Sequence, residues 1–152
     1  MQVRVQLSRD VNCKEFGANC GDIIEMDVER YLRAVVAAEI ANSPLSACEA
    51  QAIAARSFAL ALMRTRGYVR DTTDQAFIVT KDAVARYPNA IKGVENTRGK
   101  VLMYNGGIVA AQYGASNGGC TRKYKNYPYF AERDDPWDAA ETMYRKSRKR
   151  IS

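Results

Sequence analysis

The residue best suited to acid chemistry is Glu39, near the end of the alanine-rich stretch "RYLRAVVAAEIANSP" at residues 30–44. An apolar stripe at helical spacing leads up to it, formed by Val28, Tyr31, Leu32 and Val35. At about 100° per residue, Glu39 returns to within about 20° of Val28, so the pattern aims a carboxyl group at the face that a helix buries. Loss of hydration disfavours the charged form of a carboxyl group, which suits a proton donor.

The composition excludes several other kinds of chemistry. The chain has four cysteines and no histidine, which excludes Ser-His-Asp triads, Cys-His dyads and His-ligated zinc. The cysteine spacings fit no CxxC metal knuckle. Cys48 falls in a predicted helix as a small buried hydrophobe, whereas Cys13 and Cys20 could close a loop by a disulfide or remain thiols. Any catalysis must then rely on carboxylates, hydroxyls, amides and the Lys and Arg side chains.

Two helices are predicted around the carboxylate. Asp27 is a good N-cap for a helix over 28–41, which stops before Pro44 because a proline restricts the residue preceding it. Ser43 then predicts the cap of a second helix, with Pro44 at its first position and Gly67 as its C-terminal stop. The two helices are therefore close neighbours in the sequence.

The second helix carries a stripe of mostly small side chains, namely Leu45, Cys48, Ala52, Ala55, Ala59 and Leu62. Small side chains let another backbone approach closely, and the first helix is also rich in alanine. We therefore expect the two helices to pack closely, with Glu39 near the end of the first. Arg56 lies one position off the stripe and could reach the same region.

Strand patterns occupy much of the remaining sequence. Alternating side chains predict strands at 2–8 and 22–26, separated by the turn-like "NCKEFGANCG", and a further strand at 75–80. Asn105 and Gly106 then predict a hairpin with a tight primed turn. The hairpin leads into the glycine-rich loop "GASNGGC", where the backbone could approach a ligand.

These elements predict one α+β domain over residues 1–140, with two packed alanine-rich helices, a small antiparallel sheet or hairpin, and a cleft between them. Residues 141–152 are predicted to be a basic C-terminal tail. The segment "RKSRKR" at 145–150 carries five positive charges, which is typical of a solvated, disordered terminus.

The chain is basic, with 23 Lys and Arg against 17 Asp and Glu, a net charge of +6 and a pI near 9.2. Such a charge favours anionic partners, among them nucleic acid, acidic glycans and anionic lipid surfaces. Outside the tail, however, the basic residues form no stripe with interleaved aromatics, so we expect no nucleic-acid partner. No run approaches 18 consecutive apolar residues, so we expect no membrane span.

Four blocks in order carry a family resemblance: "YLRAVVAAEI", "EAQAIAARSFAL", "VENTRGKVLMYNGGIVAAQYGASNGGCT" and "YF…DDPWD". Over roughly residues 22–138 the chain resembles the stage II sporulation protein D family, which includes the amidase-enhancer (LytB-like) proteins of bacterial walls. The resemblance implies a lytic transglycosylase that cleaves the glycan strands of peptidoglycan, preferring strands stripped of stem peptides. It also implies that Glu39, in the "AAE" block, is the catalytic acid.

On this resemblance, Glu39 protonates the glycosidic oxygen between MurNAc and GlcNAc as an oxocarbenium-like centre develops. The resulting carboxylate takes the proton of the sugar's C6 hydroxyl, which closes a 1,6-anhydro ring. Because the nucleophile is intramolecular, the second carboxylate of hydrolytic glycosidases is not required. The alternative is a structural glutamate at a helix end, bonded to a neighbour such as Arg56.

The substrate-binding residues expected from the resemblance are Arg56, Gln75, Tyr113, Ser116, Asn117 and Gly118. The last three stand in the family's "SSGG" loop, which we expect to line a glycan cleft. Tyr113 precedes this loop, and Gln75 begins a block that reads Gln-x-Tyr in relatives; each could contact a sugar or belong to the core or a turn. Arg56 could hold a muramic carboxylate, orient Glu39 or form a plain salt bridge.

Some relatives bind zinc through a Cys/His cluster before the Gln block, but "RGYVRDTTDQAF" has neither residue type. We therefore predict no metal and no cofactor. The expected partners are peptidoglycan strands and a cell-wall amidase, and a non-catalytic wall-binding module that enhances an amidase is the alternative function. The family implies an extracytoplasmic, wall-associated location, although "MQVRVQLSRD" predicts a strand and not a signal peptide. Either the protein is not exported by the usual route, or the sequence begins after a removed leader.

Overall fold

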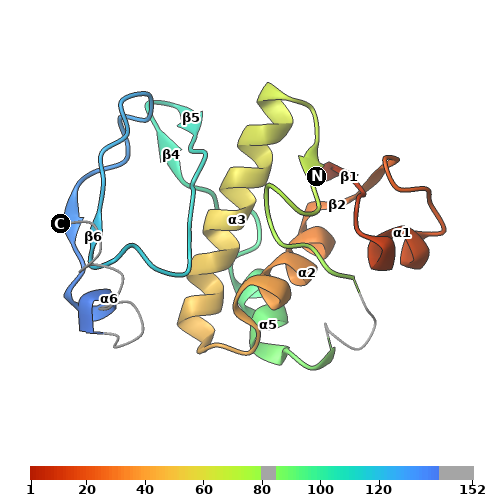
Figure 1. Ribbon diagram of the computed structural model, residues 1–152, viewed down its shortest axis with the longest axis horizontal. Helices are drawn as coiled ribbons and strands as arrows, with labels where there is room; N and C mark the ends of the chain where they lie inside the picture. Colours follow the sequence, from red (N-terminus) through yellow and green to blue (C-terminus); the bar gives the residue numbers. More distant parts are fainter. Residues whose placement is uncertain (80–84, 141–152) are drawn as a thin grey trace. The chain divides into compact units, whose positions relative to one another are not determined.

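The computed structural model describes residues 1–79 and 85–140 (Figure 1). The predicted basic tail at 141–152 therefore lies outside the described residues. The α+β class is confirmed, with five helices and small sheets among the described residues. The chain divides into two compact units, Met1–Gln112 and Tyr113–Ser152, and the domain predicted over residues 1–140 stays a prediction. Each unit is described by itself.

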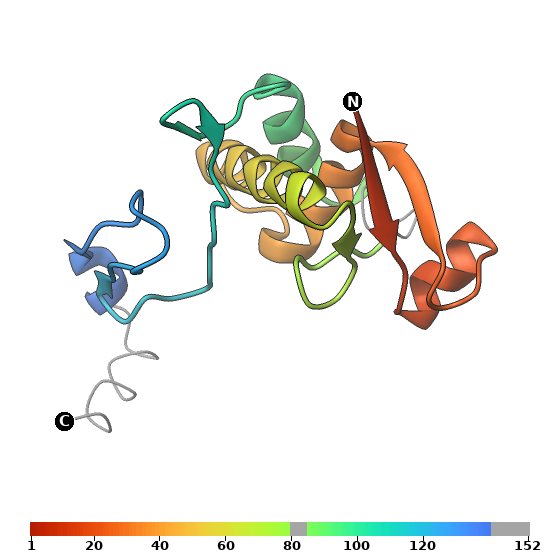
Figure 2. The ribbon, with the colours of Figure 1, turned by 90° about the horizontal axis from the view of Figure 1, so that it is seen from above.

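A three-stranded sheet begins the first unit. Its central strand, β1 (Gln2–Gln6), pairs antiparallel with β2 (Ile23–Asp27) and parallel with β3 (Val69–Arg70). Val5 lies opposite Val69 in the parallel pair, and both side chains are buried. The first two strands are confirmed. The parallel partner β3 makes the sheet mixed, where the sequence predicts an antiparallel one. The sequence did not reveal β3 because a two-residue strand is too short to show alternation. Figure 2 shows β1 and β2 side by side.

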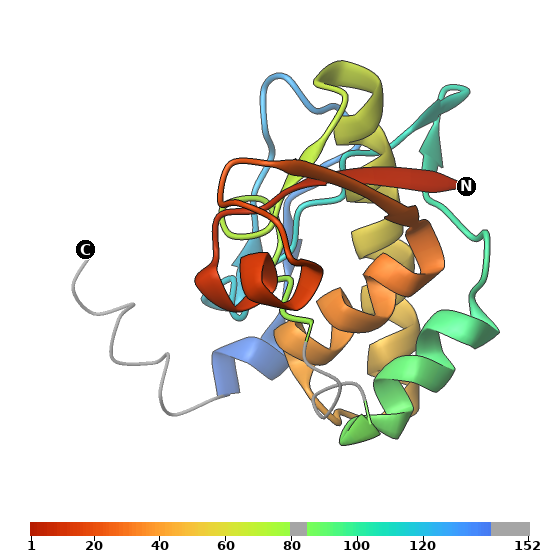
Figure 3. The same cartoon turned by 90° about the vertical axis from the view of Figure 1, so that its right-hand side faces the viewer.

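Three helices form the rest of the first unit's core: α2 (Val28–Ile40), α3 (Leu45–Thr65) and α5 (Pro88–Asn96). All three pack against one another (Figure 3). The expected close packing of α2 and α3 is confirmed, and α5 approaches α3 closely because Gly93 has no side chain. A Cβ atom added there would lie 2.8 Å from the Cβ of Cys48.

The predicted helix boundaries are confirmed at one end of α2 and corrected at the start of α3. The Asp27 carboxylate accepts hydrogen bonds from the backbone N–H groups of Glu29 and Arg30, as an N-cap does. The prediction that Ser43 caps α3 is wrong. The Ser43 hydroxyl donates to the Ile40 carbonyl at 2.6 Å, and Pro44 takes the N-cap position without a side-chain bond.

Cys48 is fully buried on α3, as predicted. Burial raises the pKa of the Cys48 thiol above its usual value. Its sulfur donates to the Ser43 carbonyl at 3.4 Å. A buried thiol with a raised pKa forms little thiolate, so Cys48 acts as a packing residue.

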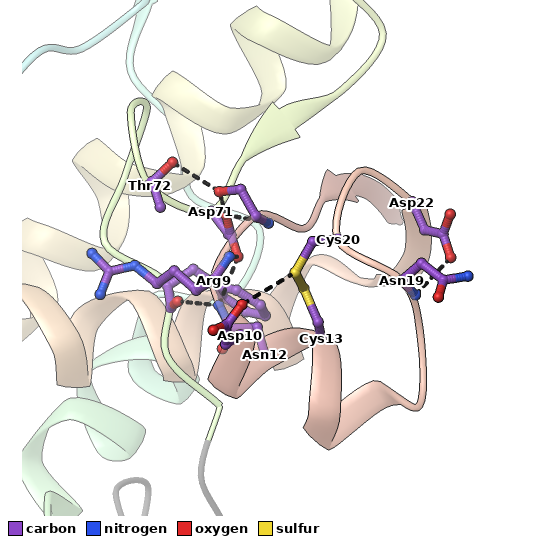
Figure 4. Close-up of a disulfide and its surroundings, with 11 residues drawn as sticks. Arg9, Asp10, Asn12, Cys13, Asn19, Cys20, Asp22, Asp71 and Thr72 are labelled. Atoms are coloured by element: carbon purple, nitrogen blue, oxygen red, sulfur yellow. Dashed lines mark hydrogen bonds between the residues drawn. A yellow bond between two sulfur atoms is a disulfide. The ribbon is translucent and has the colours of Figure 1, made fainter.

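The stretch predicted to be turn-like holds a helix, α1 (Asp10–Phe16). Gly17 ends it with φ 59°, a left-handed conformation that glycine adopts without strain. A disulfide joins Cys13 to Cys20, with the two Cα atoms 5.6 Å apart (Figure 4). Of the two alternatives left open by the sequence, the structure has the disulfide.

The strand predicted at 75–80 is not formed over its described residues, 75–79. Its backbone groups bond to side chains instead of to a neighbouring strand. The N–H of Ala76 donates to Glu39, and Asn12 bonds to both Phe77 and Val79. The apolar pattern of this stretch reflects burial of Phe77 and not a ladder of strands.

The predicted hairpin is confirmed, although its strands are short: β4 (Met103–Tyr104) and β5 (Gly107–Ile108). Asn105 and Gly106 both have positive φ, 47° and 75°, which is the conformation of the primed turn.

The second unit holds a two-stranded antiparallel sheet, β6 (Cys120–Thr121) with β7 (Arg133–Asp134), and a short helix, α6 (Pro136–Ala140). Among the described residues of both units, no helix combines the length and the apolar character needed to cross a membrane.

Candidate active site

Glu39 lies in the last turn of α2, and its side chain is half-buried. The backbone N–H of Ala76 donates to its Oε1 atom at 2.7 Å. Its Oε2 atom has no hydrogen-bond partner among the described residues. A carboxyl group held by one oxygen keeps the other available for proton transfer.

The backbone is strained just beyond this carboxylate. Ala41 ends α2 with φ 50° and ψ −133°, a conformation that residues with a side chain rarely adopt. Its N–H still donates to the Ala37 carbonyl at 3.1 Å. Strain of this kind costs roughly 1–3 kcal/mol and is often found at functional sites.

Gln75 holds the backbone that contacts Glu39. Its side chain is only 2% exposed. Its Oε1 accepts from the Tyr31 hydroxyl at 2.8 Å, and its Nε2 donates to the Ala55 carbonyl at 3.0 Å. The amide is thus bonded to α2 and α3 at once. It lies in the core, not at a surface where a sugar could contact it.

Phe77 anchors the same segment from the other side. It is fully buried, and its ring stacks on Tyr31 at a centroid distance of 5.1 Å and on Phe16 at 6.4 Å. The Ala76 amide therefore lies between two buried anchors, and Glu39 receives its hydrogen bond from a rigid piece of backbone.

Asn12 and Asp71 form a buried polar network that the sequence did not reveal. Asn12 is fully buried and donates from Nδ2 to Oδ2 of Asp71 at 2.8 Å. The same carboxylate accepts from Ser8 and from the backbone N–H of Arg9. Burial by itself raises the pKa of the Asp71 carboxyl, but the hydrogen bonds from Asn12 and Ser8 outweigh it and hold that pKa below its usual value.

Arg56 does not contact Glu39. It is 1% exposed and binds Glu29 with two hydrogen bonds, from Nε to Oε1 at 3.0 Å and from Nη2 to Oε2 at 2.7 Å. Its Nη1 donates to the Lys100 carbonyl at 3.0 Å. Of the roles left open by the sequence, the structure has the salt bridge, with a partner that the sequence did not indicate. The sequence did not single out Glu29 as a partner, because an acidic residue is common in the first turn of a helix.

The glycine-rich loop of the second unit binds the Asp138 carboxylate of α6. Asp138 accepts from the Ser116 hydroxyl at 2.8 Å and from the backbone N–H groups of Asn117 at 2.7 Å and Gly119 at 3.3 Å. The hydrogen bond from Ser116 lowers the pKa of Asp138, with the backbone bonds adding to it. Gly118 has φ 71°, which lets these N–H groups converge.

The predicted residues are divided between the two units. In the first unit, Gln75 supports the backbone beside Glu39, whereas Arg56 belongs to a separate buried salt bridge. The remaining predicted residues, Tyr113, Ser116, Asn117 and Gly118, belong to the second unit. Among residues 1–79 and 85–140, no three His, Cys, Asp or Glu side chains form a group suited to holding a metal ion.

Comparison with known proteins agrees with the motifs. The family model described as "SpoIID: Stage II sporulation protein" matches residues 17–104, more than half of the chain. The chain is 38% identical over 113 residues to the amidase enhancer of Bacillus subtilis (strain 168), covering 70% of this chain and 15% of that protein. It is 30% identical over 145 residues to stage II sporulation protein D of the same organism, covering 80% of this chain and 42% of that protein. The chain therefore spans less than half the length of either relative.

Proposed function

The chain belongs to the stage II sporulation protein (SpoIID) family, and on this premise we propose that it is a peptidoglycan lytic transglycosylase with Glu39 as its general acid and base. The observation that carries the proposal is the arrangement of that carboxyl group. It is half-buried, and one oxygen is fixed by the Ala76 N–H while the other has no partner among the described residues. It also stands in the family's "AAE" block.

In the proposed reaction, Oε2 of Glu39 carries the proton. It gives the proton to the glycosidic oxygen between MurNAc and GlcNAc as the C1–O bond breaks. The C6 hydroxyl oxygen of the muramyl sugar then bonds to C1 and loses its proton to the same carboxylate oxygen. The enzyme returns to its starting protonation state, and the product ends in a 1,6-anhydro ring.

The Ala76 N–H fixes the orientation of the carboxyl plane through both steps. Positioning of this kind counts because a misplacement of about 1 Å can cost on the order of 100-fold in rate. Tyr113, Ser116, Asn117 and Gly118 are proposed to contact the glycan. Arg56 and Gln75 act from inside the first unit by fixing its helices and the segment at residue 76.

A second candidate function is a wall-binding module that enhances an amidase without cutting glycan. The observation that favours it is the identity to the amidase enhancer. Either function places the protein at the cell wall, outside the cytoplasm, with peptidoglycan as its partner and a wall amidase as a second partner.

Product analysis distinguishes these functions. Glycan strands, denuded and peptide-bearing, are incubated with the wild type and with Glu39→Gln, and the products are identified by mass spectrometry. Anhydro-muramyl ends from the wild type alone support the transglycosylase. Reducing ends contradict it and indicate hydrolysis. Glycan binding by both proteins without any product supports the amidase-enhancing module.

A further inference from the structure

The segment before and around the disulfide has no part in the proposed reaction, yet it contacts the backbone that holds Glu39. We call residues 9–22 the α1 lobe; the Cys13–Cys20 disulfide closes it (Figure 4). All of α1 precedes residue 17, where the family match begins. The family match therefore says nothing of α1, and the effect of this helix on the site follows from the contacts of this chain's own residues.

Asn12 is the contact between the lobe and the site. Its Nδ2 donates to the Phe77 carbonyl at 2.7 Å, and its Oδ1 accepts from the Val79 N–H at 3.1 Å. One buried side chain thus satisfies two backbone groups that would otherwise need a neighbouring strand. Residue 76, which bonds to Glu39, immediately precedes this bonded stretch.

Asn12 is itself held from two directions. Its Nδ2 also donates to Asp71, whose carboxylate is bonded to the end of the first strand through Ser8. On the other side, Cys13 follows Asn12 directly and is tied by the disulfide to Cys20. Figure 4 shows Asn12 and Asp71 beside this disulfide.

We infer that Asn12 is a positioning residue for Glu39: it fixes residues 77–79, and through them the Ala76 N–H, while the Cys13–Cys20 disulfide keeps Asn12 in place. The catalytic consequence rests on the proposed function, but the geometric one does not. Without Asn12 the segment loses two backbone hydrogen bonds, and the Glu39 carboxyl group loses its fixed donor.

The test is hydrogen exchange of the Ala76 amide, measured by NMR in the wild type, in Asn12→Ala and in the control Asn19→Ala. Asn19 lies in the same lobe with an exposed side chain. We expect Ala76 to exchange at least about tenfold faster in Asn12→Ala only, because an amide without its bond is open to solvent. Val36, in the middle of α2, should keep its rate. Unchanged exchange at Ala76, or equal acceleration at Val36, would overturn the inference.

If Asn12→Ala does not fold, the wild type with its disulfide reduced replaces it. Selective acceleration at Ala76 supports the inference, and no change contradicts it. The rate of anhydro-muramyl release should fall about tenfold in Asn12→Ala with glycan affinity unchanged, since a misplaced acid slows chemistry more than binding. A wild type that releases no product would refute the proposed function, while the Ala76 amide would still decide this inference.

Discussion

Helix α2 carries a glutamate near each end, and the two are held in different ways. Glu29 is 5% exposed, and both of its oxygens are occupied by Arg56, with a further bond from the Gly99 N–H at 3.3 Å. Glu39 is half-buried, and among the described residues its one donor is the Ala76 N–H. The same residue type on the same helix thus forms a saturated structural pair at one end and an open carboxyl group at the other.

The two glutamates therefore differ both in burial and in the number of their partners among the described residues. The Glu29–Arg56 pair joins α2 to α3, and Arg56 also donates to the carbonyl of Lys100 beyond α5. Each charge of the pair faces an opposite charge in the buried core. For Glu39, Oε2 has no hydrogen-bond partner among the described residues, as the proposed proton transfer requires.

The largest effect is expected from Glu39→Gln, which keeps the shape of the side chain but removes its transferable proton. We expect the rate of anhydro-muramyl release to fall by roughly 10²–10⁴-fold. The free energy of unfolding should change by less than about 1 kcal/mol, because Gln can still accept from Ala76. Mass spectrometry of products and urea denaturation measure the two quantities. A variant that keeps its activity would remove Glu39 from the mechanism.

The matched substitution at the other end of α2, Glu29→Gln, should instead lower the free energy of unfolding. It leaves Arg56 as a buried charge without a counter-ion, which costs about 3–5 kcal/mol of unfolding free energy. Urea denaturation measures the loss. The double variant Glu29→Met with Arg56→Met serves as control and should lose less than the single one, because no charge is left unpaired. Equal stability of Glu29→Gln and the wild type would contradict the comparison.

Asp71 extends the comparison to a third carboxylate, saturated by hydrogen bonds instead of by an arginine. Its pKa is lowered in the folded protein, so its stabilising contribution is present above the pKa of the unfolded chain, about 3.9, and is lost as the pH falls through the folded value. We expect Asp71→Asn to cost about 1–3 kcal/mol at pH 7. The deficit should shrink below about pH 4. Denaturation curves at both pH values measure it, and a deficit independent of pH would contradict it.

The smallest effect is expected at Ala41, beside the open carboxylate. Glycine adopts its φ of 50° without steric cost, so Ala41→Gly should stabilise the protein by about 0.5–1 kcal/mol. Thermal unfolding measures the gain. Ala50→Gly, on the exposed face of α3, is the matched control and should destabilise by a similar amount. Destabilisation by both would show that Ala41 is not strained.

Much of the helical framework could be predicted because its causes are local. The Asp27 cap bonds to residues two and three positions away, and the hairpin turn follows from the conformations of Asn105 and Gly106. The position of Glu39 on α2 follows from helical periodicity alone. The prediction at Ser43 is wrong because its hydroxyl donates to the Ile40 carbonyl, three residues back, instead of capping α3. The strand predicted at 75–80 is not formed over 75–79 because its backbone bonds to the distant Asn12 side chain.

The sequence by itself therefore determined helices α2 and α3, the hairpin turn and the placement of a carboxyl group on a helix face, since these depend on neighbours within one or two turns. Only the tertiary structure decided that Arg56 pairs with Glu29 and that the Ala76 N–H donates to Glu39. It also decided that the Asn12 side chain, and not a neighbouring strand, bonds to the backbone of Phe77. These partners are 27, 37 and 65 residues apart. At such separations spacing carries no information on which donor meets which acceptor, and packing of the core makes the choice.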